Sequence, residues 1–257
     1  MTLAVVSFAL ITTIEFDLNV PIAFWVFIFC GTVTGYNFVK YAKIAGLHHR
    51  SLANSLRSIQ IFSFLCFAAL LLSCFFLQMD TLIVTGIFGF FTVFYAVPFL
   101  KRKNLRTFSG IKILIVALVW AGVTVFVPMV AAGMTFTTDC WLAFLQRFFL
   151  VFVLTLPFEI RDLQYDVAQL KTIPQLLGVK KAKLLGMGLL VGVLLLEGFK
   201  DTIVPSSFYS LFCMVGITGI ALLAAQKEQS RYYSSFWVEG IPIAGLLLLL
   251  LFGHFLA

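Results

Sequence analysis

The sequence predicts an all-α protein that crosses a lipid bilayer about nine times. Of its 257 residues, 61% are hydrophobic and only 11% are charged, and its mean hydropathy is +1.06. Soluble domains are about 45–50% apolar and about 25% charged, so this composition excludes a water-soluble globule. The apolar runs are continuous over roughly 17–23 residues, which is the length a helix needs to cross about 30 Å of lipid. They lack the alternating pattern of a membrane β-barrel.

Charged residues and Pro or Gly breaks divide the chain into nine apolar stretches, each of which predicts a helix. We expect these helices at 1–14, 20–42, 57–78, 81–99, 110–132, 139–158, 183–199, 204–225 and 235–256. The two long connections, 43–57 and 159–183, follow the second and the sixth helix. The second and sixth helices are four helices apart in the order of the chain, which suggests an internal repeat of four helices. We therefore expect one domain, 1–257, that contains four-helix halves 1–100 and 101–225 and a ninth helix, 235–256.

The basic residues are concentrated on one side of the expected membrane. Sixteen of the eighteen lysines and arginines lie in the loops after the second, fourth, sixth and eighth helices. Cytoplasmic loops collect Lys and Arg, so we expect these loops and the N-terminus in the cytoplasm and the C-terminus outside, in a bacterial inner membrane. The net charge of +7 is thereby explained without a nucleic-acid partner. The five cysteines lie in apolar stretches without CxxC spacing, which predicts packing residues rather than a metal site.

Some polar and small residues fall within the expected spans. Arg147 lies halfway along the sixth helix, where an ionised group needs a cavity or a partner, such as a carbonyl group or the carboxylate of Glu239. Glu197, near the end of the seventh helix, is expected at the membrane interface. Two GxxxG pairs, Gly31 with Gly35 and Gly188 with Gly192, predict closely packed helices.

The most polar segment, FEIRDLQYDVAQLKTIPQLLG at 158–178, follows the sixth helix. Asp162 and Asp166 are four residues apart, so both project from one face if the helix continues, and they can share a cation. Two carboxylates together with phosphate oxygens are typical ligands of Mg²⁺, and Arg161 and Lys171 supply positive charge for a diphosphate. The simpler alternative is a solvated loop in which these acids pair with Arg161 and Lys171.

This segment resembles the second aspartate-rich motif of the UbiA superfamily of intramembrane prenyltransferases, RDxxxDxxxGKxTLxxxLG. The matching positions are Arg161, Asp162, Asp166, Lys171, Thr172, Leu177 and Gly178, whereas Leu170 stands where the family has Gly. The resemblance covers essentially the whole chain, since the family also has nine helices with motif loops after the second and sixth. It implies a prenyl diphosphate substrate, an aromatic or lipophilic acceptor, and Mg²⁺ bound by Asp162 and Asp166.

The first motif of the family, NDxxDxxxD, is degenerate in this sequence. Asn37 keeps the Asn, but the three Asp positions hold Phe38, Tyr41 and Ala45, and no carboxylate occurs between Asp17 and Asp80. We therefore expect one Mg²⁺ instead of two. The resemblance implies catalytic roles for Asn37, Asp162 and Asp166. Substrate binding is expected from Lys40, Lys43, Tyr165, Arg161 and Lys171. The simpler interpretation of Lys40 and Lys43 is that they are ordinary positive-inside residues.

Three functions remain open at this point. The first is an active prenyltransferase, in which Lys40 and Lys43 take over part of the role of the missing metal. The second is a binding protein that holds an isoprenoid or another membrane lipid without chemistry. The third, a transporter, is less favoured because only Arg147 lies at the middle of the membrane and no pair of broken helices marks a central site.

Overall fold

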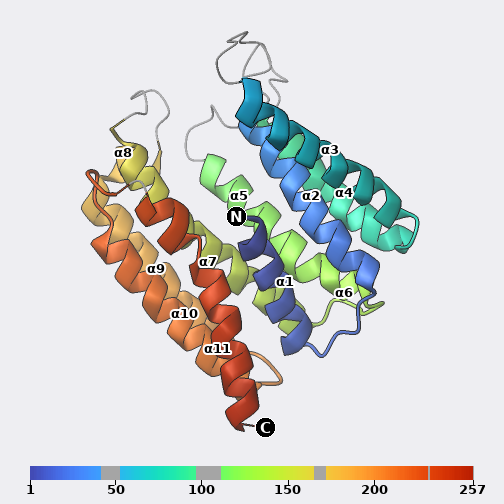
Figure 1. Cartoon of the computed structure of the whole chain (residues 1–257). Coiled ribbons are helices and arrows are strands. Elements are labelled where there is room, and N and C mark those ends of the chain that lie inside the picture. Colours follow the sequence, from blue (N-terminus) through green and yellow to red (C-terminus); the bar gives the residue numbers. More distant parts are fainter. Residues whose placement is uncertain (42–52, 97–110, 165–171, 231, 257) are drawn as a thin grey trace.

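The computed structural model describes the chain except for residues 42–52, 97–110, 165–171, 231 and 257 (Figure 1). The first half contains α1 (Thr2–Glu15), α2 (Ile22–Tyr41), α3 (Ala53–Cys74), α4 (Met79–Ala96) and α5 (Ile111–Ala121), which continues through η3 (Gly122–Phe126) into α6 (Val127–Ala131). The second half contains α7 (Thr138–Asp162), α8 (Ile173–Leu177), α9 (Val179–Glu197), α10 (Pro205–Ala224), η5 (Tyr233–Val238) and α11 (Ile241–Leu256). The described residues form no strand, so the all-α prediction is confirmed.

The expected helices correspond in order to the long helical segments of the structure. Two of them contain a π-helical stretch, because α5, η3 and α6 form one continuous segment and η5 leads into α11. The helix α7 ends at Asp162, four residues beyond the expected end at 158, and therefore carries the start of the polar segment. The short helix α8 lies within a connection that we had expected to be a loop.

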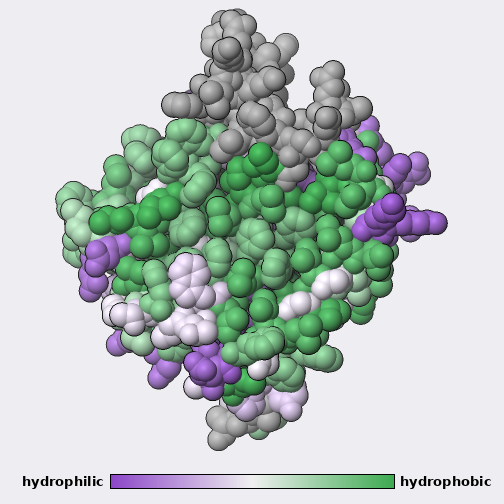
Figure 2. All heavy atoms as spheres, turned by 180° about the vertical axis from the view of Figure 1, so that it is seen from behind, coloured by the Kyte–Doolittle hydropathy of each residue, from purple (hydrophilic) through white to green (hydrophobic). Residues whose placement is uncertain are grey.

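Five of the helical segments are long and apolar enough to cross a membrane. They are Ile22–Val39, Ile111–Ala131, Thr138–Asp162, Pro205–Ala224 and Tyr233–Phe255. Three further apolar helices are shorter, namely Thr2–Glu15, Ile59–Cys74 and Met79–Tyr95. Large apolar side chains such as Phe64 and Phe75 on and beside α3 are more than two-thirds exposed. Figure 2 shows the same property over the rear face, which is broadly hydrophobic with hydrophilic residues toward its edges, as expected for a surface in contact with lipid.

The helices form three groups that lie side by side (Figure 1). On one side α2 packs on α3 and contacts α4, and on the other side α10 packs on both α9 and α11. Between them, α7 contacts α5 and α9, while α1 lies against α11 and α2. Fully buried side chains such as Phe8, Leu150 and Leu156 fill the central group. The connections alternate between the two ends of the bundle, so α2 and α7 both end where α5 and α9 begin.

Two charged residues within this fold test the expectations for intramembrane charges. The guanidinium group of Arg147 on α7 donates to the Phe8 carbonyl oxygen across 2.8 Å and lies 4.1 Å from the centroid of the Phe8 ring. Of the two partners expected for Arg147, a carbonyl group or the Glu239 carboxylate, the structure shows the carbonyl group. Glu197, expected at the membrane interface, is the last residue of α9 and is only 2% exposed, and its depth in the membrane stays a prediction. Its carboxylate is tolerated there because it accepts a hydrogen bond from Gln146 and pairs with Lys200.

Candidate functional site

The candidate site begins at the last turn of α7. This helix starts at the cap residue Thr137, whose hydroxyl accepts a hydrogen bond from the Cys140 backbone N–H across 3.3 Å. Pro157 removes one backbone hydrogen bond from the helix interior, yet the helix continues to Asp162. At that end the Arg161 guanidinium contacts the Asp162 carboxylate through Nε at 2.8 Å and Nη2 at 2.7 Å. These two motif residues are therefore brought together with half-buried side chains, as the solvated-loop alternative also allows.

A buried carboxylate lies one helical turn deeper on α7. Glu159 precedes Asp162 by three residues, is only 4% exposed, and its Oε1 atom lies 3.9 Å from the Lys112 ammonium at the start of α5. The sequence alone predicted no role for Glu159 or for Lys112. The available signal was the spacing of Glu159 and Asp162, since residues three apart lie on one face of a helix.

The second half of the polar segment has a structural role that the motif comparison alone did not reveal. The Thr172 backbone N–H donates to the Gln175 side chain across 3.0 Å, which caps the start of α8. Gly178 connects α8 to α9 with a φ angle of +80°, a conformation that residues with a Cβ atom rarely adopt. The positive φ angle therefore explains why this position holds glycine, since Gly178 sets the direction in which α9 starts.

The retained Asn of the first motif is held between two helices. Asn37 is half-buried near the end of α2, and its Nδ2 atom donates to the Ser63 hydroxyl on α3 across 2.6 Å. The end of α2 lies at the same end of the bundle as the end of α7 (Figure 1). The expected grouping of both motifs on one face of the membrane is consistent with this arrangement.

Several of the expected site residues lie outside the described part of the chain. They are Lys43, Tyr165, Asp166 and Lys171. Lys40 belongs to the last turn of α2, but its side chain is also outside the described part. The roles inferred for these residues from the resemblance stay predictions.

The described residues offer the oxygen ligands that Mg²⁺ prefers. Asp162 supplies carboxylate oxygens and Asn37 supplies an amide oxygen, both of which are hard donors. One Asp162 oxygen contacts the Arg161 guanidinium, and the metal-binding role of Asp162 stays a prediction. Within the described ranges, no three His, Cys, Asp or Glu side chains form a metal-binding group. A donor set of so few side chains fits an ion that completes its coordination with diphosphate oxygens and water.

The chain is similar in structure to several solved UbiA proteins. The apo structure of a UbiA homolog from Aeropyrum pernix K1 matches with a TM-score of 0.70 and 17% sequence identity, over 96% of each chain. A UbiA homolog from Archaeoglobus fulgidus bound to GPP and Mg²⁺ matches with a TM-score of 0.60 and 11% identity, over 98% of this chain and 95% of that chain. A digeranylgeranylglyceryl phosphate synthase matches with a TM-score of 0.57 and 17% identity, over 98% of this chain and 91% of that chain.

By sequence, no family model and no curated protein matches the chain. The structural matches and the apolar helices together define the class, an integral membrane protein of helical bundle type. Its fold is the UbiA fold, over nearly its entire length. The fold implied by the two motifs is therefore confirmed.

Proposed function

We propose that this chain is a UbiA superfamily protein that binds a prenyl diphosphate and transfers its prenyl group to an aromatic or lipophilic acceptor. The observation that carries the proposal is the position of the Arg161 and Asp162 pair at the end of α7. This helix belongs to a UbiA fold, which matches the homolog from Aeropyrum pernix K1 over 96% of each chain. The structure of the relative bound to GPP and Mg²⁺ supports the choice of ligand class.

The diphosphate is proposed to bind where α2 and α7 end. Asp162 and Asp166 hold one Mg²⁺, with Asn37 as a further oxygen donor, and the ion neutralises diphosphate charge when it is bound. Direct counter-charges come from the basic side chains around this end, namely Arg161, Lys171, Lys40 and Lys43. The prenyl tail enters the apolar bundle, and Tyr165 is assigned to substrate binding because an aromatic side chain can stabilise the positive charge that develops at C1 of the prenyl group.

In the transfer step, the bond between C1 and the bridging diphosphate oxygen breaks, and the diphosphate keeps the electron pair. The acceptor atom bonds to C1 and releases a proton. Arg161 and the lysines stabilise the charge that develops on the departing diphosphate. Lysine ammonium groups lack the Lewis-acid character of a metal, so turnover is expected to be slow compared with a site that has two metal ions.

The loss of the first motif favours a second candidate function. Phe38, Tyr41 and Ala45 replace three carboxylates, which removes one expected Mg²⁺ site. A protein with this site can bind an isoprenoid diphosphate or a related lipid without transferring it.

Two measurements on the purified full chain test the proposal. Calorimetry with geranyl diphosphate, with and without Mg²⁺, is expected to show binding that requires Mg²⁺ and saturates at one ion per chain. Release of pyrophosphate in the presence of a phenolic acceptor indicates the transferase, whereas binding without release indicates the non-catalytic alternative. Absence of any Mg²⁺-dependent binding would reject both. Movement of labelled prenyl diphosphate across sealed vesicles would instead point to a transporter.

A further inference from the structure

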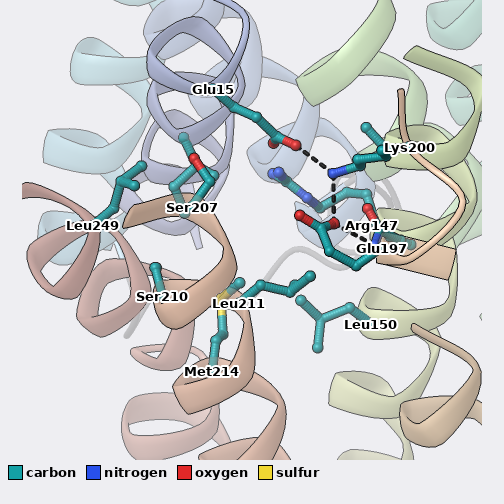
Figure 3. Close-up of a pocket in the computed structure, with 13 residues that line it drawn as sticks. Glu15, Arg147, Leu150, Glu197, Lys200, Ser207, Ser210, Leu211, Met214 and Leu249 are labelled. Carbon is teal, nitrogen blue, oxygen red and sulfur yellow. Dashed lines mark hydrogen bonds and ion pairs between the residues drawn. The ribbon is translucent and has the colours of Figure 1, made fainter. Parts of the chain in front are cut away.

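A group of four charges, three buried and one partly buried, lies where α1 and α9 end, at the end of the bundle opposite the candidate diphosphate site (Figures 1 and 3). It comprises Glu15 at the end of α1, Arg147 on α7, Glu197 at the end of α9, and Lys200 in the loop that follows. The Lys200 ammonium pairs with the Glu15 carboxylate and, across 2.7 Å, with Glu197. Two positive and two negative charges therefore balance within this group, which we call the outer charge cluster.

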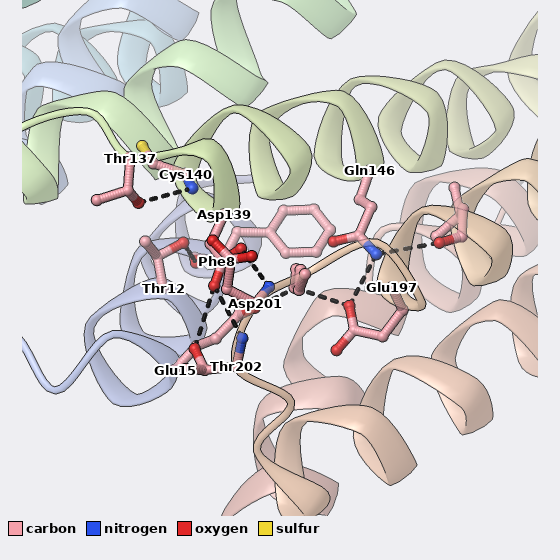
Figure 4. A network of polar contacts seen from close by, with 12 residues as sticks. Phe8, Thr12, Glu15, Thr137, Asp139, Cys140, Gln146, Glu197, Asp201 and Thr202 are labelled. Atoms are coloured by element: carbon pink, nitrogen blue, oxygen red, sulfur yellow. Dashed lines mark hydrogen bonds and ion pairs between the residues drawn. The ribbon is translucent and has the colours of Figure 1, made fainter.

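Further hydrogen bonds fix the loop that carries Lys200 (Figure 4). Asp139 on α7 accepts from the backbone N–H groups of Asp201 and Thr202, at 2.8 Å and 3.2 Å. Gln146 donates to Glu197 across 2.8 Å and to the Val193 carbonyl oxygen across 3.0 Å. The outer charge cluster is thus a built site rather than a set of mobile surface side chains.

Arg147 makes one hydrogen bond to the described residues of the protein. Its guanidinium group has five N–H donors, and one donates to the Phe8 carbonyl oxygen. Among the described residues no carboxylate lies within salt-bridge distance of it, although Glu15 and Glu197 line the same cavity. Oppositely charged groups that share a cavity without direct contact are commonly joined by water.

Beside Arg147 lies a small cavity, of about 30 Å³, that is lined by the outer charge cluster and by two serines of α10. Ser210 donates to the Gly245 carbonyl oxygen across 2.7 Å. Ser207 is only 7% exposed, and its hydroxyl oxygen is buried without a hydrogen-bond partner among the described residues. A buried hydroxyl group without a partner is destabilising, so Ser207 points to a missing ligand.

We infer that this cavity is a water-binding site that completes the outer charge cluster. A water molecule needs about 10–15 Å³ of such space and two to four polar partners, so a cavity of about 30 Å³ accommodates about two. Water accepts from the Arg147 guanidinium and exchanges hydrogen bonds with the Ser207 hydroxyl. It donates to the Glu15 carboxylate. The bound water thereby solvates a charge that lies within a membrane-spanning helix, and it links α1, α7 and α10 by hydrogen bonds.

Alanine substitution of Ser207 tests this inference by the sign of its effect on thermal unfolding of the full chain in detergent. If water fills the cavity, Ser207→Ala removes one of its partners, and the unfolding midpoint falls by about 2–4 °C. If the cavity is dry, the same substitution removes a hydroxyl without a partner, and the midpoint rises. An unchanged or higher midpoint would therefore overturn the inference.

Two serines on the same helix provide controls. Ser206 is half-buried and does not line the cavity, so Ser206→Ala is expected to leave the midpoint unchanged. Ser210→Ala loses the hydrogen bond to Gly245 and is expected to lower it. An experimental structure that resolves ordered water is a second, independent test. Density within hydrogen-bonding distance of Ser207 Oγ and the Arg147 guanidinium is expected, and an empty cavity in such a map would contradict the inference even if Ser207→Ala does not fold.

Discussion

The side-chain amide of Asn37 is oriented by Ser63. The Ser63 hydroxyl donates its single proton to the Ile59 carbonyl oxygen across 2.7 Å, so it can only accept from Asn37 Nδ2, at 2.6 Å. The amide nitrogen therefore points toward α3, and the amide oxygen is left for another partner. A hard cation requires an oxygen donor, so under the proposed role of Asn37 as a Mg²⁺ ligand Ser63 is expected to act as its positioning residue.

The first prediction concerns this orientation. Ser63→Ala removes the acceptor for the Asn37 amide, and we expect Mg²⁺-dependent affinity for geranyl diphosphate to fall by about 1 kcal/mol, or about fivefold. Ser63→Thr keeps a hydroxyl group and is expected to retain most of the affinity. Calorimetry at saturating Mg²⁺ measures both variants. Equal affinities for the two variants would show that the Asn37 amide needs no orientation.

The second prediction distinguishes the residues that bind the metal from the lysines that contact the diphosphate directly. Asp162→Ala or Asp166→Ala should remove the Mg²⁺ dependence of binding together with most of the affinity, because the cation that links the diphosphate to the protein is lost. Lys40→Ala and Lys43→Ala should weaken binding at every Mg²⁺ concentration, each by about 1–3 kcal/mol. Titrations over a range of Mg²⁺ concentrations distinguish these patterns. Binding that ignores Mg²⁺ and all four substitutions would mean that the motif resemblance reflects ancestry alone.

The third prediction concerns the buried pair of Lys112 and Glu159. Lys112→Met leaves the 4%-exposed Glu159 carboxylate without this cation, and we expect a loss of about 1–3 kcal/mol in the free energy of unfolding. The double variant Lys112→Met with Glu159→Leu removes both charges and is expected to recover part of that loss. Denaturant unfolding in detergent provides the measurement. A double variant less stable than Lys112→Met would contradict an electrostatic role for the pair.

The fourth prediction concerns orientation in the membrane. Single cysteines introduced near Arg50, Arg102 and Lys171, in a background without native cysteines, should react only with reagent added from the cytoplasmic side. Cysteines near the exposed residues Asp80 and Asp201 should react only from the opposite side. Asp139 is unsuitable as a position because its carboxylate is buried against the loop after α9. Labelling of one group from both sides would contradict the expected topology.

The fifth prediction follows from Lys200. Burial alone would lower its pKa, but the charges of Glu15 and Glu197 and the hydrogen bonds to them raise the pKa above its ordinary value of 10.5. Because the folded state favours the ammonium form, this stabilisation is fully present below pH 10.5 and is lost as the pH rises through the raised value. We expect the unfolding midpoint to fall in that range, and to fall less for Lys200→Met. An identical decline in both proteins would exclude the Lys200 contribution.

The sequence predicted the elements that depend on local pattern. The apolar runs gave the order of the long helices, because a membrane-spanning segment must satisfy its own backbone hydrogen bonds over a fixed length. Arg161 and Asp162 were expected in the connection after the sixth helix, and they form the last turn of α7 instead. The roles of Asp166 and Lys171, and the division into two four-helix halves, stay predictions.

Tertiary relationships were harder to predict. Glu15 is far from Glu197 and Lys200 in the chain, so no local pattern shows that its carboxylate pairs with Lys200 within the bundle. The GxxxG prediction was wrong for three of its four positions, because a Cβ atom at Gly35, Gly188 or Gly192 would meet nothing within 4 Å. Close approaches occur at other glycines, such as Gly122 and Gly186, where a Cβ atom would lie 2.0 Å from Phe88 and 2.4 Å from Leu222. Whether a glycine is needed depends on the side chain opposite it, which the spacing of glycines does not reveal.

The packing of α1 against α11 has a consequence for how the protein is made. Phe8 and Ala9 on α1 are fully buried, and α1 packs against α2, which follows it directly, and against α11, which comes more than 200 residues later. During synthesis α1 therefore emerges long before α11 exists, and the contacts between these two helices form only after α11 has entered the membrane. Until then, the translocation machinery or the lipid must shield the face of α1 that later contacts α11.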